Sequence, residues 1–221
     1  FAIALLDRKN DTIYFIRDRM GKKPFYYYIG ESGEIVFASE LKAIMQYSTS
    51  IKRINKNIIG KYLCKQYIAA PDTIFENTYK LESGGTLIIK EGKITKWKYW
   101  DIAQKYKELR LNKIINYEQA KYELKENLIK AIKERFIADV PIGAFLSGGY
   151  DSTIVCALAQ QMLNKPIKTF SLGFYSGHVD EAKYAKKVAE YLNTEHYEIY
   201  PEDKDIIRMI TDIPFYFDEP F

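Results

Sequence analysis

The chain has 221 residues, of which 47% are hydrophobic and 28% are charged, as in an ordinary globular protein. Its formal net charge is only +4 and its basic residues are spread along the chain, which argues against a dedicated nucleic-acid surface. No apolar run approaches the length that a membrane span needs, and no signal peptide is recognisable.

The cysteines and histidines indicate neither a disulfide nor a protein-built zinc site. Cys64 and Cys156 fall in helical-looking segments, so we expect small buried residues in a reducing compartment. His178 and His196 have no partners at metal-ligand spacing. A cytoplasmic protein that does not associate with membranes is therefore expected.

The first hundred residues alternate short apolar runs with turns. Residues 1–6 and 12–16 are predicted to form a hairpin, and a tyrosine-rich strand follows Pro24. Residues 35–38 continue the strand pattern, and Ser39 before a glutamate and an apolar run predicts a helix start. This pattern favours an α+β domain with antiparallel strands.

A helix and a second hairpin complete this part of the chain. Residues 55–66 have a helical pattern, and residues 86–89 and 94–100 are predicted to pair across Glu91-Gly92. Residues 101–115 are polar, rich in lysine and weakly periodic. We place an interdomain linker there.

The second half alternates helices and strands. Asn116 is predicted to cap a helix with one apolar stripe. Strands are expected at 141–146, 167–172 and 196–200, and helices at 153–163 and 180–192, the latter with Asp180 as its N-cap and Asn193 at its end. Such alternation predicts a doubly wound parallel sheet, covered on both faces, whose ligands bind at the carboxyl ends of the strands.

The stretch Ser147-Gly148-Gly149-Tyr150-Asp151-Ser152 follows the first of these strands and precedes a helix. Two glycines let the backbone approach a ligand, and the free N–H groups of a helix's first turn favour an anion. The turn lacks the Gly-Lys-Ser/Thr of a Walker A motif and has the acid Asp151 instead. An acid beside bound phosphates suits Mg²⁺ held between the carboxylate and phosphate oxygens.

Three stretches carry a family resemblance. Residues 138–152 resemble, position by position, the PP-loop of the glutamine-dependent asparagine synthetase family. Arg17-Asp18-x-x-Gly21-x-x-Pro24-Phe25-Tyr26 and Ala38-Ser39-Glu40-Leu41-Lys42-Ala43 resemble the second half of that family's class II glutaminase domain. The resemblance implies a partial N-terminal-nucleophile glutaminase domain over 1–100, a linker over 101–115 and a partial PP-loop ATP pyrophosphatase domain over 116–221.

The ends of the chain indicate an internal fragment. Phe1 begins mid-strand without a methionine, and Phe221 follows an acidic proline turn. In the family the nucleophilic cysteine lies upstream of the matched residues, and further residues near the acceptor lie downstream. We therefore expect no catalytic residue within this chain, no glutamine hydrolysis and no amide synthesis by it alone.

The resemblance also implies the chemistry of the longer protein: ATP-dependent conversion of aspartate to asparagine through an acyl-adenylate, with ammonia from glutamine and release of AMP and pyrophosphate. ATP and Mg²⁺ are the implied ligands, with Mg²⁺ bound by Asp151 through the pyrophosphate. The implied nucleotide-binding residues are Phe145, Leu146, Ser147, Gly148, Gly149, Asp151, Ser152 and Leu172.

The chain departs from the family pattern at a few places. Tyr150 stands where leucine is commonest, Thr153 where serine is common, and Glu82-Ser83 where a proline pair is usual. Neither of the first two changes removes a required group, and the third concerns only the local geometry of a turn. Asp218-Glu219-Pro220-Phe221 resembles the start of a segment that approaches the acceptor, but an acid pair before proline is equally typical of a solvated turn.

Four interpretations stay open at this point. The acceptor is aspartate, or it is a uronic-acid sugar of a surface polysaccharide, as in relatives with Gly-Gly-Tyr-Asp-Ser. A base-adenylating RNA-modifying enzyme would need a basic, aromatic-rich surface or a cysteine pair, and the sequence has neither. A non-catalytic scaffold is the fourth. Small-molecule partners are expected and no nucleic acid; a homodimer is left open.

Overall fold

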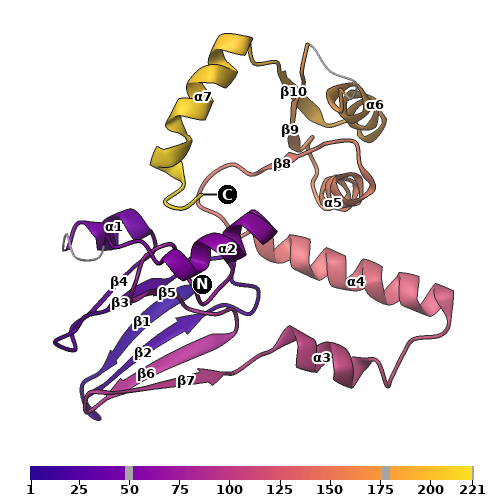
Figure 1. The fold of residues 1–221 in the computed structure, drawn as a ribbon. Helices are drawn as coiled ribbons and strands as arrows, with labels where there is room; N and C mark the ends of the chain where they lie inside the picture. Colours follow the sequence, from indigo (N-terminus) through magenta and orange to yellow (C-terminus); the bar gives the residue numbers. More distant parts are fainter. Residues whose placement is uncertain (48–51, 176–179, 221) are drawn as a thin grey trace. The chain divides into compact units, whose positions relative to one another are not determined.

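The computed structural model describes residues 1–47, 52–175 and 180–220, and these form two compact units (Figure 1). Unit 1 contains residues 1–112 together with 211–221, and unit 2 contains residues 113–210. Both units mix helices with strands, as the sequence predicts. No helix in the described ranges has the length and apolar character that a bilayer span requires.

Unit 1 contains two antiparallel sheets. The first has the order β1-β2-β6-β7, with β1 Ala2–Asp7, β2 Thr12–Arg17, β6 Gly85–Lys90 and β7 Lys93–Lys98. The second has the order β4-β3-β5, with β4 Ile35–Ala38, β3 Tyr26–Ile29 and β5 Thr78–Lys80. Both predicted hairpins, β1–β2 and β6–β7, are confirmed by the strand pairing.

An aromatic core joins the two sheets of unit 1. Phe15 of β2 and Leu87 of β6 pack against Tyr27 of β3 and against Phe25, which directly precedes β3. The rings of Phe15 and Phe25 lie 4.9 Å apart. Phe15, Tyr27 and Leu87 are at most 1% exposed. Burying side chains of this size contributes roughly 1.5–3 kcal/mol each, so this cluster contributes substantially to the stability of the unit.

Three helices of unit 1 lie outside its sheets: α1 Leu41–Met45, α2 Lys56–Lys65 and α3 Ile102–Leu109. The helix expected over 55–66 is confirmed as α2, and the Asn55 side chain caps it by accepting a hydrogen bond from the amide of Asn57 at 3.2 Å. Helix α1 begins at Leu41 and not at Ser39, and its N-cap is Glu40, whose side chain makes no capping bond. The predicted linker contains α3.

The Arg17-Asp18 motif organises the turn before β3. The Asp18 carboxylate accepts hydrogen bonds from the amides of Met20, Lys22 and Lys23 at 2.9–3.1 Å. The Arg17 guanidinium donates to the carbonyls of Gly21, Lys23 and Leu81. Burial alone would raise the pKa of Asp18, but the amides of Lys23 and Lys22 outweigh it and hold that pKa well below its usual value. The motif that carries the family resemblance here is therefore structural.

Unit 2 is built on three parallel strands in the order β10-β9-β8, with β8 Gly143–Phe145, β9 Lys168–Leu172 and β10 Glu195–Ile199. Its helices are α4 Tyr117–Arg135, α5 Tyr150–Gln161 and α6 Ala182–Leu192. Helix α7 Asp203–Tyr216, absent from the sequence prediction, crosses the division between the units. The predicted parallel pairing is confirmed.

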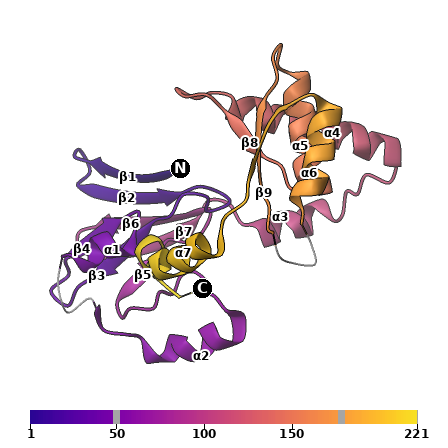
Figure 2. The same ribbon diagram turned by 90° about the horizontal axis from the view of Figure 1, so that it is seen from above.

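Helices cover one face of this sheet. Figure 2 shows α5 and α6 on one side of β8 and β9. Leu146 and Cys156 pack there with Ala185 and Ala189 of α6, and Ile132 of α4 packs against the other side of α5. On the opposite face Phe145 is 88% exposed and Leu172 is 51% exposed. Within the described residues no helix covers that face, so the doubly wound arrangement stays a prediction.

Several sequence expectations for unit 2 need correction. Helix α5 begins at Tyr150, not Thr153, and helix α6 has Glu181 as its N-cap, although Asp180 accepts a hydrogen bond from the amide of Ala182. Asn193 ends α6, as predicted, and the structure shows that it does so in the left-handed conformation. Cys156 is buried and both cysteines are free, but Cys64 of unit 1 is exposed, because α2 turns that side outward. His178 lies outside the described residues.

We predict that Asp18→Ala destabilises unit 1 by about 1–3 kcal/mol at pH 7, because the substitution removes the acceptor of three amides. Both tryptophans, Trp97 and Trp100, lie in unit 1, so urea unfolding followed by their fluorescence measures it. Since the folded-state pKa is lowered, the contribution is present above the unfolded pKa of about 4 and is lost as the pH falls. The difference in unfolding free energy between the wild type and the variant should therefore narrow below pH 4. Glu31→Gln, at an exposed acid of the next turn, is the control; a gap that stays constant down to pH 2 would contradict the assignment.

Candidate functional site

The turn after β8 lies at the carboxyl edge of the parallel sheet in unit 2. Phe145 ends β8 opposite Phe170 of β9, and the amide of Leu146 continues the pairing with a 2.8 Å hydrogen bond to the Phe170 carbonyl. Leu172, the last residue of β9, ends at the same edge. In open α/β sheets this edge is where ligands bind.

The two glycines of the turn have different surroundings. Gly148 has a φ of +79°, and a Cβ there would lie 2.7 Å from the Cβ of Tyr184 and 2.8 Å from the amide nitrogen of Ala185. Gly149 has a φ of −74°, and its nearest neighbour to such a Cβ is the Ser147 Oγ at 3.5 Å. Gly148 therefore lets the turn pack on α6, while Gly149 leaves open space beside the backbone.

Two hydroxyl groups brace the turn. The Oγ atoms of Ser147 and Ser152 lie 3.0 Å apart, and the Ser152 Oγ also accepts from the Ser147 amide at 3.2 Å and donates to the Gly149 carbonyl at 3.2 Å. These bonds connect the last residue of the hexapeptide to its first. The conformation of the turn is thus set before any ligand binds.

Helix α5 starts directly from this turn, with Gly149 as its N-cap. Its first backbone hydrogen bond runs from the Thr153 amide to the Gly149 carbonyl at 3.0 Å. The amides of the first turn before Thr153 have no acceptor within the helix, and the helix dipole adds partial positive charge there. Ser147, Gly149 and Asp151 are exposed, so side chains of the chain do not fill this end. The arrangement suits a phosphate.

Buried Cys156 and half-buried His196 lie next to the residues of the candidate site. Burial raises the pKa of the Cys156 thiol, whose Sγ points at the Phe145 carbonyl at 3.9 Å, so Cys156 stays protonated at neutral pH and packs as a small apolar residue. Burial lowers the pKa of His196, whose ring nitrogens bond the hydroxyls of Thr169 and Ser171 at 2.9 and 3.2 Å. His196 therefore links β10 to the end of β9, next to Leu172.

The structure brings together the predicted nucleotide-binding residues at one edge. Seven of them form the turn and its flanks, and Leu172 ends the neighbouring strand. Asp218 and Glu219 belong to unit 1 and not to this site. Sequence reasoning missed Tyr184 and His196, because contacts between separate elements leave no pattern in the chain.

Asp151 is the one acid that the first turn of α5 offers. Among the described residues no group of three or more histidine, cysteine or acidic side chains could bind a metal by itself. Mg²⁺ commonly takes one or two carboxylates and completes its shell with phosphate oxygens and water. An exposed carboxylate such as that of Asp151 is the kind of protein ligand that this ion accepts.

Two protein-family models match this chain. A glutamine amidotransferase domain model matches residues 1–100, and an asparagine synthase model matches residues 123–221. The chain therefore joins part of a glutamine amidotransferase domain to part of an asparagine synthase domain. It belongs to the glutamine-hydrolysing asparagine synthetase family.

Individual relatives match along the whole chain. A protein of Methanocaldococcus jannaschii named as a second glutamine-hydrolysing asparagine synthetase is 37% identical over 100% of the chain, which spans 42% of that relative. Asparagine synthetase 1 of Bacillus subtilis is 28% identical over 100% of the chain, which spans 34% of it. The solved ammonia-dependent NAD synthetase of Campylobacter jejuni covers 41% of the chain and is covered to 40%, with a TM-score of 0.33 and 19% identity, a likeness too slight to support the fold.

We predict that Gly148→Ala destabilises unit 2 by about 2 kcal/mol or more, because a methyl group at positive φ would collide with α6. Gly149→Ala is the matched control one residue away and should cost less than about 1 kcal/mol, since it meets no backbone and keeps a negative φ. Hydrogen exchange of the α5 and α6 peptides measures both. Equal protection in the two variants would contradict the packing described for Gly148.

Proposed function

We propose that the protein containing this chain is an ATP-dependent ligase that converts aspartate to asparagine with ammonia from glutamine. The observation that carries the proposal is the open Ser-Gly-Gly-x-Asp-Ser turn at the start of α5, in a chain whose first hundred residues match a glutamine amidotransferase model. The family match supports asparagine biosynthesis.

The chemistry explains why such a site is useful. A carboxylate is a poor electrophile, because its charge repels nucleophiles and oxide is a very poor leaving group. When a carboxylate oxygen of the acceptor attacks the α-phosphorus of ATP, pyrophosphate leaves and an acyl-adenylate forms. Ammonia then attacks the acyl carbon, and the C–O bond to AMP breaks to leave the amide. The charge that develops on pyrophosphate requires donors that are already in place.

The residues of the turn would supply those donors. The amides of Gly148 and Gly149 and the first turn of α5 would bind the pyrophosphate oxygens, with the hydroxyls of Ser147 and Ser152 beside them. Because the two hydroxyls already bond one another, little reorganisation is needed when the nucleotide binds. Phe145, Leu146 and Leu172 would border the adenine at the same edge of the sheet.

Asp151 would hold Mg²⁺ against the phosphates. When bound, the ion supplies positive charge that offsets the charge on the departing pyrophosphate. The contribution of the chain is the placement of one exposed carboxylate on the first turn of a helix, next to the open side of Gly149.

The domain division remains part of the proposal: a glutaminase part over 1–100, a connection over 101–115 and an ATP-binding part over 116–221. The family matches cover 1–100 and 123–221 and leave the stretch between them unmatched. We further propose that the parallel sheet of unit 2 belongs to a doubly wound PP-loop domain, since its exposed apolar face, with Phe145 and Leu172, suits a covering layer.

We predict that Asp151→Asn in the full-length protein lowers pyrophosphate release about 100-fold, equivalent to ~2.7 kcal/mol, because Mg·ATP loses its protein carboxylate. The loss should be equal with glutamine and with ammonium as nitrogen source, since both feed the same adenylation step. Glu190→Gln, at an exposed acid on α6, is the control and should retain full activity.

Acceptor dependence tests the substrate in the same assay. Pyrophosphate release that requires aspartate supports the proposal, and release that requires a uronic-acid sugar instead would replace aspartate as the acceptor. Wild-type activity that needs neither ATP nor Mg²⁺ would overturn the function altogether.

A further inference from the structure

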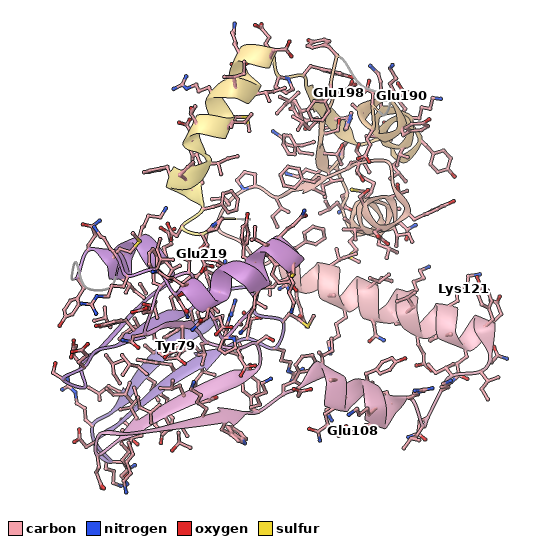
Figure 3. The ribbon with its side chains drawn as sticks, viewed as in Figure 1. Tyr79, Glu108, Lys121, Glu190, Glu198 and Glu219 are labelled. Atoms are coloured by element: carbon pink, nitrogen blue, oxygen red, sulfur yellow. The ribbon has the colours of Figure 1, made fainter. Side chains whose placement is uncertain are left out.

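The acidic turn that follows α7 packs onto the sheets of unit 1. Residues 211–221 group with residues 1–112, and Figure 3 labels Glu219 just after the end of helix α7. The side chains of Asp218 and Glu219 are only 11% and 12% exposed. The turn is therefore not the solvated acid pair that the sequence alone allowed.

Glu219 is bound from two sides. Its carboxylate forms an ion pair with the Nζ of Lys80 on β5 and accepts a 2.8 Å hydrogen bond from the amide of Ile74. Lys80 is itself only 15% exposed, and its Nζ also donates to the Ile68 carbonyl at 2.6 Å. A lysine this poorly hydrated needs a counter-charge, and Glu219 supplies it.

Asp218 makes the second attachment, to α1. It accepts a 3.1 Å hydrogen bond from the amide of Lys42, and the Lys42 Nζ lies 3.6 Å from its other oxygen. The same Nζ donates to the carbonyl of Phe215 at 2.6 Å and lies 5.0 Å from the ring centre of Phe215. Lys42 thus binds both the last turn of α7 and the acid that follows it.

These contacts differ from ordinary surface ion pairs. The pair Lys204–Glu202 near the start of α7 is 74% and 63% exposed and should contribute little. In Lys80–Glu219, removal of either partner leaves the other charge nearly buried and unpaired. The two attachments together fix both the position and the direction of the turn.

The residues that meet here come from the two family matches. Lys42 and Lys80 lie within the glutamine amidotransferase match, and Asp218 and Glu219 lie within the asparagine synthase match. We propose that Asp218 and Glu219 are positioning residues that anchor the synthase part to the glutaminase part, so that ammonia made by one is used by the other. The anchoring role does not depend on the proposed function, whereas the use of ammonia by the synthase part rests on it.

The experiment uses the full-length protein with Glu219→Gln and Lys80→Met. Glu219→Gln keeps the size of the side chain and removes its charge, and Lys80→Met removes the opposite charge. Glu202→Gln, in the exposed ion pair at the start of α7, is the control. Two quantities are measured: hydrogen exchange of the Ile74 amide, and the glutamate released per amide formed.

We expect exchange at Ile74 to quicken about tenfold in both variants, because its acceptor is no longer held. The glutamate released per amide should rise about threefold or more, while ammonium-supported synthesis changes less than about twofold. The double variant should be no worse than the worse single variant, since both changes break one pair.

Each of the other outcomes contradicts one part of the proposal. If the Ile74 amide exchanges in Glu219→Gln and Lys80→Met at the same rate as in Glu202→Gln, the anchoring role is wrong. Faster exchange with an unchanged glutamate-to-amide ratio overturns the coupling and leaves a purely structural contact. If the wild-type protein forms no amide with any acceptor, the proposed function fails, and the exchange at Ile74 still decides the anchor.

Discussion

The contact between Gly148 and helix α6 constrains the whole candidate site. The turn approaches so closely that no side chain fits between Gly148 and the backbone of Tyr184 and Ala185. Small residues on α6, among them Ala185 and Ala189, pack with Leu146 just before the turn. Helix α6, which follows much later in the chain, therefore sets the shape of the turn.

Much of the fold follows from local chemistry. Asn55 and Asn116 cap helices because their side chains accept first-turn amides, and Asn193 ends a helix because it tolerates the left-handed conformation. The parallel pairing of β9 follows from apolar strands that alternate with helices. These signals lie within a few residues of the feature they predict.

The errors arise where tertiary structure decides. Helix α5 begins at Tyr150, directly after its N-cap Gly149. The sequence prediction began it at residue 153, because Tyr150-Asp151-Ser152 is too polar to show an apolar helical pattern. Helix α7 contains Pro214, which normally argues against a helix interior. Cys64 is apolar in pattern but lies on the outer side of α2. Of the candidate site, the turn was predictable from its motif, while His196 and Tyr184 depend on distant contacts.

The acids of this chain show how surroundings assign roles to one side-chain type. Asp151 stands exposed on the first turn of α5, where the helix dipole favours its charge and solvent or a metal can reach it. Asp218 and Glu219 carry the same charge but are nearly buried against Lys42 and Lys80. The Ile74–Glu219 bond joins residues 145 positions apart, so no sequence window could reveal it. A carboxylate that is already paired has little charge left to offer a cation, and that difference in pairing separates Asp151 from Asp218 and Glu219.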